Sequence, residues 1–171
     1  MKDTDPEVGI LIGSDSDLEI MKEAEKRLDE FGIAYETRIL SAHRTPQQTM
    51  KYALSASQRG IKVIIVGAGA AAHLAGAIAA QTTLPVIGVP IDSSSLKGLD
   101  ALLSTVQMPA GVPVATMAIG KAGAANAGIL AAEILAGGDS KIAARLARFK
   151  KELARGVEHK DKKLRKERQE R

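Results

Sequence analysis

The sequence predicts an α/β fold in which helices cover both faces of a mostly parallel sheet. Short apolar runs rich in branched residues alternate along the chain with segments whose apolar residues recur at helical spacing. Glycines follow the first two helical segments, where a left-handed residue commonly ends a helix. The chain has 171 residues, enough for one domain with its own core and too few for two ordinary domains.

The first strand is predicted at Val8–Ile12, a short apolar run that ends at a glycine. The helix that follows has apolar residues three or four positions apart and a glycine at its end: Met21, Ala24, Leu28, Phe31 and Gly32. The same alternation then continues. The expected segments are a strand at 34–40, a helix at 46–59, a strand at 62–66, a helix at 74–81, a strand at 85–89, a helix at 99–106, a strand at 112–118 and a helix at 122–135.

Residues 141–171 form a C-terminal extension of the domain at 1–140 and belong to the same folded unit. Their apolar residues follow one face of a predicted helix: Ile142, Leu146, Phe149, Leu153 and Val157. We expect this apolar stripe to be buried against another surface, either on the helix's own domain or on another subunit. Beyond about His159 the charged sequence KDKKLRKERQER predicts that the helix frays.

The net charge of +4 at pH 7 is unevenly distributed. Residues 141–171 carry 13 Lys and Arg against 5 Asp and Glu, whereas residues 1–140 carry 11 against 15. The basic character therefore belongs to the tail. Because the chain has only two Tyr, two Phe and no Trp, it offers little for stacking against bases, and we expect no nucleic-acid partner.

The composition also bears on the compartment. There are no cysteines, which excludes disulfides, thiolate zinc sites and a cysteine nucleophile. The start MKDTDPEVGI has acidic residues in place of the positive flank and apolar run of a secretion signal. The weakly polar run at 63–80 is mostly Gly and Ala, which suits a buried crossover better than a membrane span. We therefore expect a cytoplasmic protein with no membrane partner.

Open parallel sheets bind ligands outside the carboxyl ends of their strands, so the loops after the predicted strands are the candidates for a site. They read GSDSD (13–17), SAHRTP (41–46), GAGAAAH (67–73) and PIDSSS (90–95). GSDSD joins a turning glycine to two serines, and the free amides that open a helix attract anions such as phosphate. Helix capping alone also selects Ser and Asp here, and that alternative stays open.

SAHRTP places a proton carrier beside a permanent cation. The guanidinium of Arg44 can hold an oxyanion at two points, and His43 is the side chain type that exchanges protons near neutrality. Pro46 suits the first turn of the next helix. An ordinary surface turn with a solvated arginine is the alternative.

GAGAAAH is spaced like a dinucleotide fingerprint but lacks its third glycine, and because Asp92 falls near the expected acidic position the signal is weak but present. A lone histidine at such a position, His73, is more often structural than catalytic. The chain has no Walker glycine-lysine loop, no G-x-S-x-G elbow and no HExxH pair, and three scattered histidines make a metal site improbable. The residues themselves thus indicate proton transfer on a small phosphate-bearing ligand, with His43 central.

Together, GSDSD, SAHRTP, GAGAAAHL and the run LLSTVQMPAGVPVATMAIGKAGAANAGILAAEIL resemble the class I N5-carboxyaminoimidazole ribonucleotide mutases of bacterial purine biosynthesis. This family is also described as the catalytic subunit of phosphoribosylaminoimidazole carboxylase, and the resemblance covers about residues 8–136. It implies a three-layer αβα sandwich of flavodoxin-like type, a homo-octamer, and catalysis with no metal and no organic cofactor. The implied reaction moves a carboxylate from the exocyclic nitrogen to C4 of an aminoimidazole ribonucleotide.

The resemblance also implies roles for single residues. Ser14, Asp17 and Arg44 are expected to hold the ribose-phosphate end of the substrate, and His43 is expected to carry the proton. The other substrate-binding residues that it implies are Gly13, Ser16, Ser41, Ala42, Gly69, Ala70, His73 and Leu74.

The chain departs from the family in the loop after the third strand, which usually reads GAGGAAHLPG. Ala70 replaces a glycine and Ala75 a proline, and Leu18 stands where Trp is frequent. A Cβ at residue 70 predicts either crowding of the ligand or a backbone moved away from positive φ. Two alternatives remain beside the mutase: a carboxylase that uses carbon dioxide, and a non-catalytic nucleotide-binding homologue. The stretch VQMPAGVPVATMAIG favours the mutase over the carboxylase.

Overall fold

A five-stranded sheet organises the computed structural model, which describes residues 5–169. Its strands are β1 (Val8–Ile12), β2 (Tyr35–Ile39), β3 (Val63–Gly69), β4 (Val86–Ile91) and β5 (Ala115–Thr116). They lie in the order β2-β1-β3-β4-β5, and each neighbouring pair is parallel. The predicted parallel sheet is confirmed, and its strand order is that of flavodoxin-like folds.

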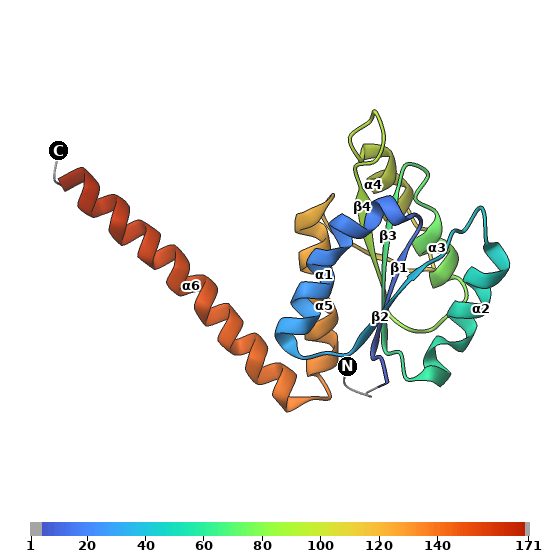
Figure 1. Ribbon diagram of the computed structural model, residues 1–171, viewed down its shortest axis with the longest axis horizontal. Coiled ribbons are helices and arrows are strands. Elements are labelled where there is room, and N and C mark those ends of the chain that lie inside the picture. Colours follow the sequence, from blue (N-terminus) through green and yellow to red (C-terminus); the bar gives the residue numbers. More distant parts are fainter. Residues whose placement is uncertain (1–4, 170–171) are drawn as a thin grey trace.

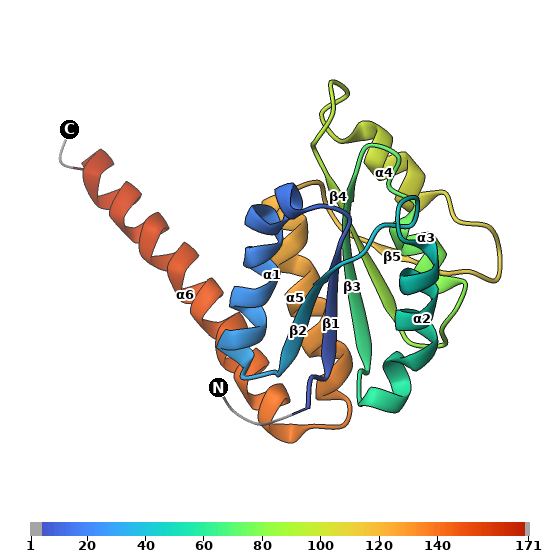
Figure 2. The same cartoon turned by 45° about the vertical axis from the view of Figure 1, so that its right-hand side comes forward.

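Helices cover both faces of the sheet, which gives three layers (Figure 2). The helices α1 (Leu18–Phe31) and α5 (Lys121–Ala136) lie side by side on one face. On the other face lie α2 (Pro46–Ala56), α3 (Leu74–Ala79) and α4 (Leu99–Val106). The predicted three-layer αβα sandwich is therefore confirmed.

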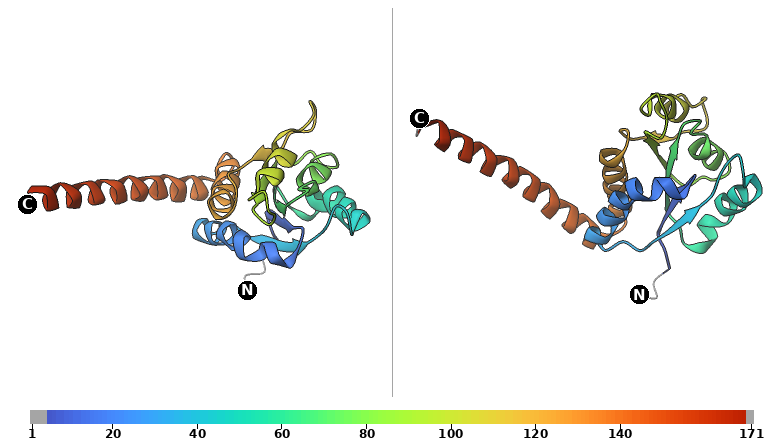
Figure 3. Two further views of the ribbon diagram at one scale, coloured as in Figure 1. Left: turned by 90° about the horizontal axis from the view of Figure 1, so that it is seen from above. Right: turned by 45° about the horizontal axis from the view of Figure 1, so that its top comes forward.

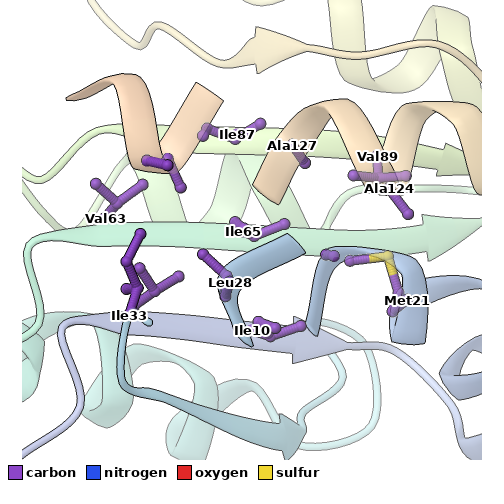
Figure 4. Close-up of a cluster of buried hydrophobic side chains, with 14 of the residues drawn as sticks. Ile10, Met21, Leu28, Ile33, Val63, Ile65, Ile87, Val89, Ala124 and Ala127 are labelled. Carbon is purple, nitrogen blue, oxygen red and sulfur yellow. The ribbon is translucent and has the colours of Figure 1, made fainter. Parts of the chain in front are cut away.

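The core consists of two apolar layers that the sheet separates. Because side chains alternate across a strand, Ile10 and Ile65 point toward α1 and α5, whereas Leu11 and Ile64 belong to the cluster on the opposite face. Figure 4 shows the first layer, in which the strands' branched side chains meet Met21 and Leu28 of α1 and the alanines of α5. Burial on both faces explains why these strands are apolar throughout.

Close packing of α5 on α1 depends on small residues. At Gly128 an added Cβ would lie 2.8 Å from the carbonyl oxygen of Ala24, closer than carbon and oxygen approach without bonding. The alanine- and glycine-rich sequence of α5 thus lets the two helices touch along their backbones, and it holds α1 firmly against the sheet.

The order and type of the elements agree with the prediction, but several boundaries differ. The strand expected at 112–118 pairs with β4 only at Ala115–Thr116. The chain turns just before this strand, where the amide of Val112 donates to the carbonyl of Pro109, and Pro113 has no amide hydrogen to donate to a neighbouring strand. The helix expected to reach residue 81 ends at Ala79, and β3 continues to Gly69 instead of stopping at residue 66. Because β3 is longer than predicted, it includes the first residues of the Gly/Ala sequence at its carboxyl end.

The C-terminal helix α6 (Ser140–Gln169) has a packed part and an exposed part. Near its start Ile142 and Leu146 are buried, and Phe149 meets the ring of Phe31 edge to face with 5.5 Å between centroids. Farther along, the side chains of Leu153 and Val157 are 53% and 69% exposed. The first third of the helix therefore packs on its own domain, while the remainder leads away from it (Figures 1 and 3).

The expectation that the chain frays beyond His159 is wrong, since α6 continues to Gln169. Ion pairs one turn apart accompany the continuation: Arg165 lies 2.9 Å from Asp161, and Lys163 lies 4.0 Å from Glu167. Such pairs each stabilise an exposed helix by a few tenths of a kcal/mol, on the order of 0.3. None of the helices between residues 5 and 169 combines the length and the apolar character that a membrane crossing requires.

Candidate active site

A pocket of about 310 Å³ opens at the carboxyl ends of β1, β2 and β3. Sheets of this strand order bind ligands at the carboxyl ends of their strands. The pocket lies next to the β1–β3 pair, the switch point from which successive strands are added on opposite sides. The loops after β1 and β2 supply most of its polar groups, and the end of β3 with the loop after it supplies small apolar ones. Its lining consists of Gly13, Ser14, Ser16, Asp17, Ser41, Ala42, His43, Arg44, Ala68, Gly69, Ala71, Leu74 and Ser93.

The loop after β1 makes a short 3-10 turn at Asp15–Asp17 and leads directly into α1. Ser14 caps this turn, accepting a hydrogen bond from the Ser16 amide at 3.4 Å. The side chain of Asp17 is turned inward, with only 4% of the residue exposed, and it accepts a hydrogen bond from the Ser16 hydroxyl at 3.3 Å. Burial raises the pKa of the Asp17 carboxyl above its ordinary value.

The loop after β2 is braced by Ser41 and Thr45. The Ser41 amide donates to the Thr45 hydroxyl at 2.9 Å, and that hydroxyl donates back to the Ser41 carbonyl at 3.1 Å. The Arg44 guanidinium reaches across to the loop after β1, where its Nη2 donates to the carbonyl oxygen of Gly13 at 2.7 Å. This bond joins the two loops and places a permanent positive charge at the pocket.

His43 makes its contact with the loop after β3. Its Nε2 atom lies 2.9 Å from Nδ1 of His73, and the two rings meet nearly at right angles, with 77° between their planes. The contact joins residues 30 positions apart in the sequence. Both side chains are exposed, and His43 also lines the pocket.

Small residues at the end of β3 and in the loop after it form one wall of the pocket. Gly69 is required there, because an added Cβ would lie 1.8 Å from Oγ of Ser93 and 3.1 Å from the carbonyl oxygen of Ile91. The next residue, Ala70, has φ of 50°, so the expected move away from positive φ does not occur. The chain turns at Ala70, which is not among the residues that line the pocket.

Most of the residues implied by the sequence come together in this pocket. Ten of them line it: Gly13, Ser14, Ser16, Asp17, Ser41, Ala42, His43, Arg44, Gly69 and Leu74. Ala70 and His73 do not line it, although the side chain of His73 contacts that of His43.

Three lining residues are not among the substrate-binding residues that the resemblance implied: Ala68, Ala71 and Ser93. Two lie within the Gly/Ala loop, and Ser93 lies in PIDSSS after β4, which the rule of strand ends had marked as a candidate loop. The close approach of Ser93 to Gly69 depends on the register of β3 against β4, which pairs Gly69 with Ile91.

The pocket thus combines one cation, several hydroxyls and backbone amides, one buried carboxyl and one histidine. Such a set can hold an anionic, hydroxyl-bearing ligand and exchange a proton with it. Between residues 5 and 169 there is no group of three or more His, Asp and Glu side chains arranged to hold a metal ion.

Comparison with known proteins agrees with this geometry. A sequence model described as AIR carboxylase matches residues 7–156. The chain is 60% identical over 150 residues to the N5-carboxyaminoimidazole ribonucleotide mutase of Vibrio parahaemolyticus, covering 88% of this chain and 93% of that protein. It is 57% identical over 164 residues to the mutase of the same name from Pyrococcus horikoshii, with 96% and 92% covered.

A solved structure gives the same answer at the level of the fold. The crystal structure of Treponema denticola PurE superimposes with a TM-score of 0.84 at 31% identity, and the match covers 93% of this chain and 98% of that one. Both the length of the sequence matches and the agreement of the fold exceed what a shared architecture alone would give. The chain belongs to the AIR carboxylase family.

Proposed function

We propose that this protein is an N5-carboxyaminoimidazole ribonucleotide mutase of purine biosynthesis, an isomerase that moves a carboxylate from the exocyclic nitrogen to C4 of the imidazole. The observation that carries the proposal is that relatives of that name, at 57% and 60% identity, coincide with a pocket that both His43 and Arg44 line. The relatives' name favours the mutase over the carboxylase that uses carbon dioxide.

The substrate's ribose phosphate is assigned to the polar side of the pocket. Arg44 holds the phosphate together with the hydroxyl of Ser14, because a guanidinium gives an oxyanion two parallel hydrogen bonds. Asp17 accepts hydrogen bonds from the ribose hydroxyls. This division keeps the carboxyl of Asp17 away from the phosphate, which it would otherwise repel.

His43 carries the proton in this reaction. It donates a proton to the exocyclic nitrogen, the N–carboxylate bond breaks, and the carboxylate leaves as carbon dioxide while the bonding electron pair stays on nitrogen. The C4 carbon, rich in electrons like an enamine, then attacks carbon dioxide. His43 finally removes the C4 proton, which restores the aromatic ring and returns the histidine to its starting state.

The loop after β3 provides the surroundings that this sequence of steps needs. Free carbon dioxide must stay beside the ring until C4 attacks it, and water must stay out. The small apolar residues Ala68, Gly69 and Ala71, with the side chain of Leu74, form a wall suited to a small uncharged molecule. Gly69 and Ala71 allow the ligand to approach the backbone closely.

The assembly and the compartment are part of the same proposal. We expect a cytoplasmic homo-octamer that works without a metal or organic cofactor. The exposed distal stripe of α6 at Leu153 and Val157, on a basic segment attached to an acidic body, supports docking on a second copy of the chain. A small ribonucleotide is the expected substrate, and neither nucleic acid nor membrane is an expected partner.

The decisive experiment offers the purified protein two substrates in separate reactions. One is the N-carboxylated ribonucleotide without added bicarbonate, and the other is the uncarboxylated aminoimidazole ribonucleotide with bicarbonate. The proposal expects rapid formation of the C4-carboxylated product only in the first reaction. Product formed mainly in the second reaction would identify a carboxylase, and ligand binding with no product in either would identify a non-catalytic homologue.

A further inference from the structure

The contact between His43 and His73 has consequences for the proton chemistry of the pocket. The 2.9 Å separation of His43 Nε2 and His73 Nδ1 is a hydrogen-bond distance, so one of these two nitrogens carries a hydrogen that the other accepts. The same contact makes Nε2 unavailable to a ligand. The nitrogen of His43 that remains for the substrate is therefore Nδ1, which makes no hydrogen bond within residues 5–169.

The side chain of His73 has no other task in the described part of the chain. It stands at the N-cap of α3 but forms no capping hydrogen bond with its side chain, and it does not line the pocket. Its backbone holds the loop in shape, with its amide bonded to the carbonyl of Ala71 at 2.8 Å and its carbonyl accepting from the Ala77 amide at 2.9 Å. A substitution at residue 73 therefore changes the contact with His43 while keeping the backbone bonds.

We propose that His73 is a positioning residue, which accepts the Nε2–H hydrogen of His43 and thereby dedicates Nδ1 of His43 to proton exchange with the substrate. This inference rests on the proposed function, in which His43 first donates a proton and then takes one back. This positioning role replaces the substrate-binding role that the resemblance implied for His73.

The direction of the hydrogen bond follows from counting protons. When His43 is charged, both of its nitrogens carry hydrogen, and the Nε2–H can only be donated, so His73 must present a bare Nδ1 and carry its own hydrogen on Nε2. After Nδ1 of His43 gives its proton to the substrate nitrogen, the Nε2–H bond to His73 is unchanged. Nδ1 then has a free lone pair, ready for the C4 proton.

The opposite direction fails at this last step. If Nδ1–H of His73 donated to Nε2 of His43, neutral His43 would carry its hydrogen on Nδ1 and would have no lone pair there for the C4 proton. A fixed Nε2–H bond keeps one tautomer and one ring orientation through both steps, as an orienting partner does for other functional histidines. His73 itself stays neutral throughout and neither gains nor loses a proton.

Two substitutions at residue 73 separate positioning from mere packing. His73→Leu removes the acceptor and should lower kcat by about 10- to 100-fold, the loss seen when a functional histidine is deprived of its orienting partner, with KM within about twofold. His73→Asn places an amide oxygen near the position of Nδ1 and should restore most of kcat. The matched control is His159→Leu on the exposed part of α6, which should leave kcat unchanged.

Unchanged kcat in His73→Leu, or equal losses in the Leu and Asn variants, would overturn the proposal. Circular dichroism of each variant checks that the fold and the melting temperature are kept. A gain in KM with constant kcat would also contradict it, because that result would restore His73 to substrate binding.

The tautomer can be observed without any turnover. Nitrogen-15 NMR of histidine-labelled wild-type protein, with His43 assigned from the His43→Asn spectrum, should show neutral His43 protonated at Nε2 and bare at Nδ1, and His73 bare at Nδ1. A bare Nε2 on His43 would refute the proposed direction of the bond. Because this measurement needs no substrate, it decides the direction of the bond even if the wild-type protein fails the mutase assay, and the two failures are thus distinguishable.

Discussion

His43 and Arg44 are neighbours in the sequence, yet their side chains serve different loops. Arg44 reaches back to the loop after β1 and bonds to Gly13, whereas His43 contacts His73 in the loop after β3. The bracing of the turn by Ser41 and Thr45 fixes the point from which the two side chains diverge. One short turn thereby joins three strand ends into a single pocket.

The positive charge of Arg44 can be tested by its removal. Arg44→Met keeps much of the side chain's length but loses the charged hydrogen bonds to the phosphate, each of which contributes about 1.5–3 kcal/mol. We expect KM to rise by about 10- to 100-fold, with a much smaller change in kcat, in steady-state assays. A large fall in kcat at constant KM would instead place Arg44 at the reacting end of the substrate.

Asp17 predicts a pH effect on stability. Burial raises the pKa of this carboxyl in the folded protein, so the folded state favours the protonated form more than the unfolded state does. The wild-type protein therefore loses stability as pH rises from the ordinary carboxyl pKa to the raised one. Above that window it carries the full cost of a buried carboxylate.

The measurement for Asp17 compares urea unfolding of wild type and Asp17→Asn between pH 3 and pH 7. The Asn side chain can still accept the Ser16 hydrogen bond, and it has no charge to bury. We expect Asp17→Asn to be the more stable protein at pH 7, with the difference shrinking toward pH 3, while substrate affinity falls. A wild-type protein that is more stable than the variant at pH 7 would disprove this account of Asp17.

At the scale of the elements, two adjacent small residues at the end of β3 have different requirements. Gly69 needs the absence of a Cβ, because Ser93 and the Ile91 carbonyl occupy that space. Ala70 has a Cβ but holds a left-handed backbone with φ of 50°, which costs a non-glycine residue about 1–2 kcal/mol. Packing therefore leaves no room for a Cβ at residue 69, whereas at residue 70 the backbone conformation is strained.

Exchanging the residue types at these two positions should have opposite effects. Gly69→Ala should lower the free energy of unfolding by about 1–3 kcal/mol through overpacking, and it should reduce activity because the pocket wall moves. Ala70→Gly should raise it by about 0.5–1 kcal/mol, since relief of the left-handed strain exceeds the added entropy of the unfolded chain. Urea denaturation measures both, and equal effects of the two changes would contradict this reading of the loop.

The sequence predicts the order of these elements better than their ends. Buried strands are apolar throughout, and helices with one buried face have apolar residues at helical spacing. These patterns are clear in the sequence, so the predicted alternation of strands and helices is correct throughout residues 8–135. The strand expected at 112–118 was too long because a prolyl residue and a preceding turn interrupt its pairing with β4.

For the site, the rule of strand ends predicted the correct loops, because parallel strands bring their carboxyl ends to one edge. The sequence did not predict which side chains contact one another in the site. The contact of His43 with His73 and that of Gly69 with Ser93 depend on loop shape and strand register, which residue types alone do not encode.

At the scale of the whole molecule, α6 is the feature that a single domain does not account for. A helix of 30 residues is about 45 Å long, and only its first third is packed against α1 and α5. The exposed stripe that continues along it has no partner among residues 5–169. An isolated helical segment of this length is marginal in water, so docking on another copy would stabilise it.

Assembly can be measured by light scattering at micromolar concentration. We expect the full chain to form an octamer, and Leu153→Lys combined with Val157→Lys to dissociate it while the melting temperature of the domain changes little. Deleting residues 152–171 should act in the same direction, since Ile142, Leu146 and Phe149 remain to anchor α6. A full-length chain that is monomeric at micromolar concentration would contradict the proposed assembly.

The central claim is that this chain moves a carboxylate within one ribonucleotide by using His43 as the proton carrier. Its most direct test follows the conversion of the N-carboxylated ribonucleotide to the C4-carboxylated product near neutral pH, with wild type and His43→Asn compared at saturating substrate. We expect wild type to accelerate the conversion far above the spontaneous rate, and the variant to bind the substrate but lose at least about 10²-fold in kcat. No acceleration by the wild type, or full activity in His43→Asn, would contradict the claim.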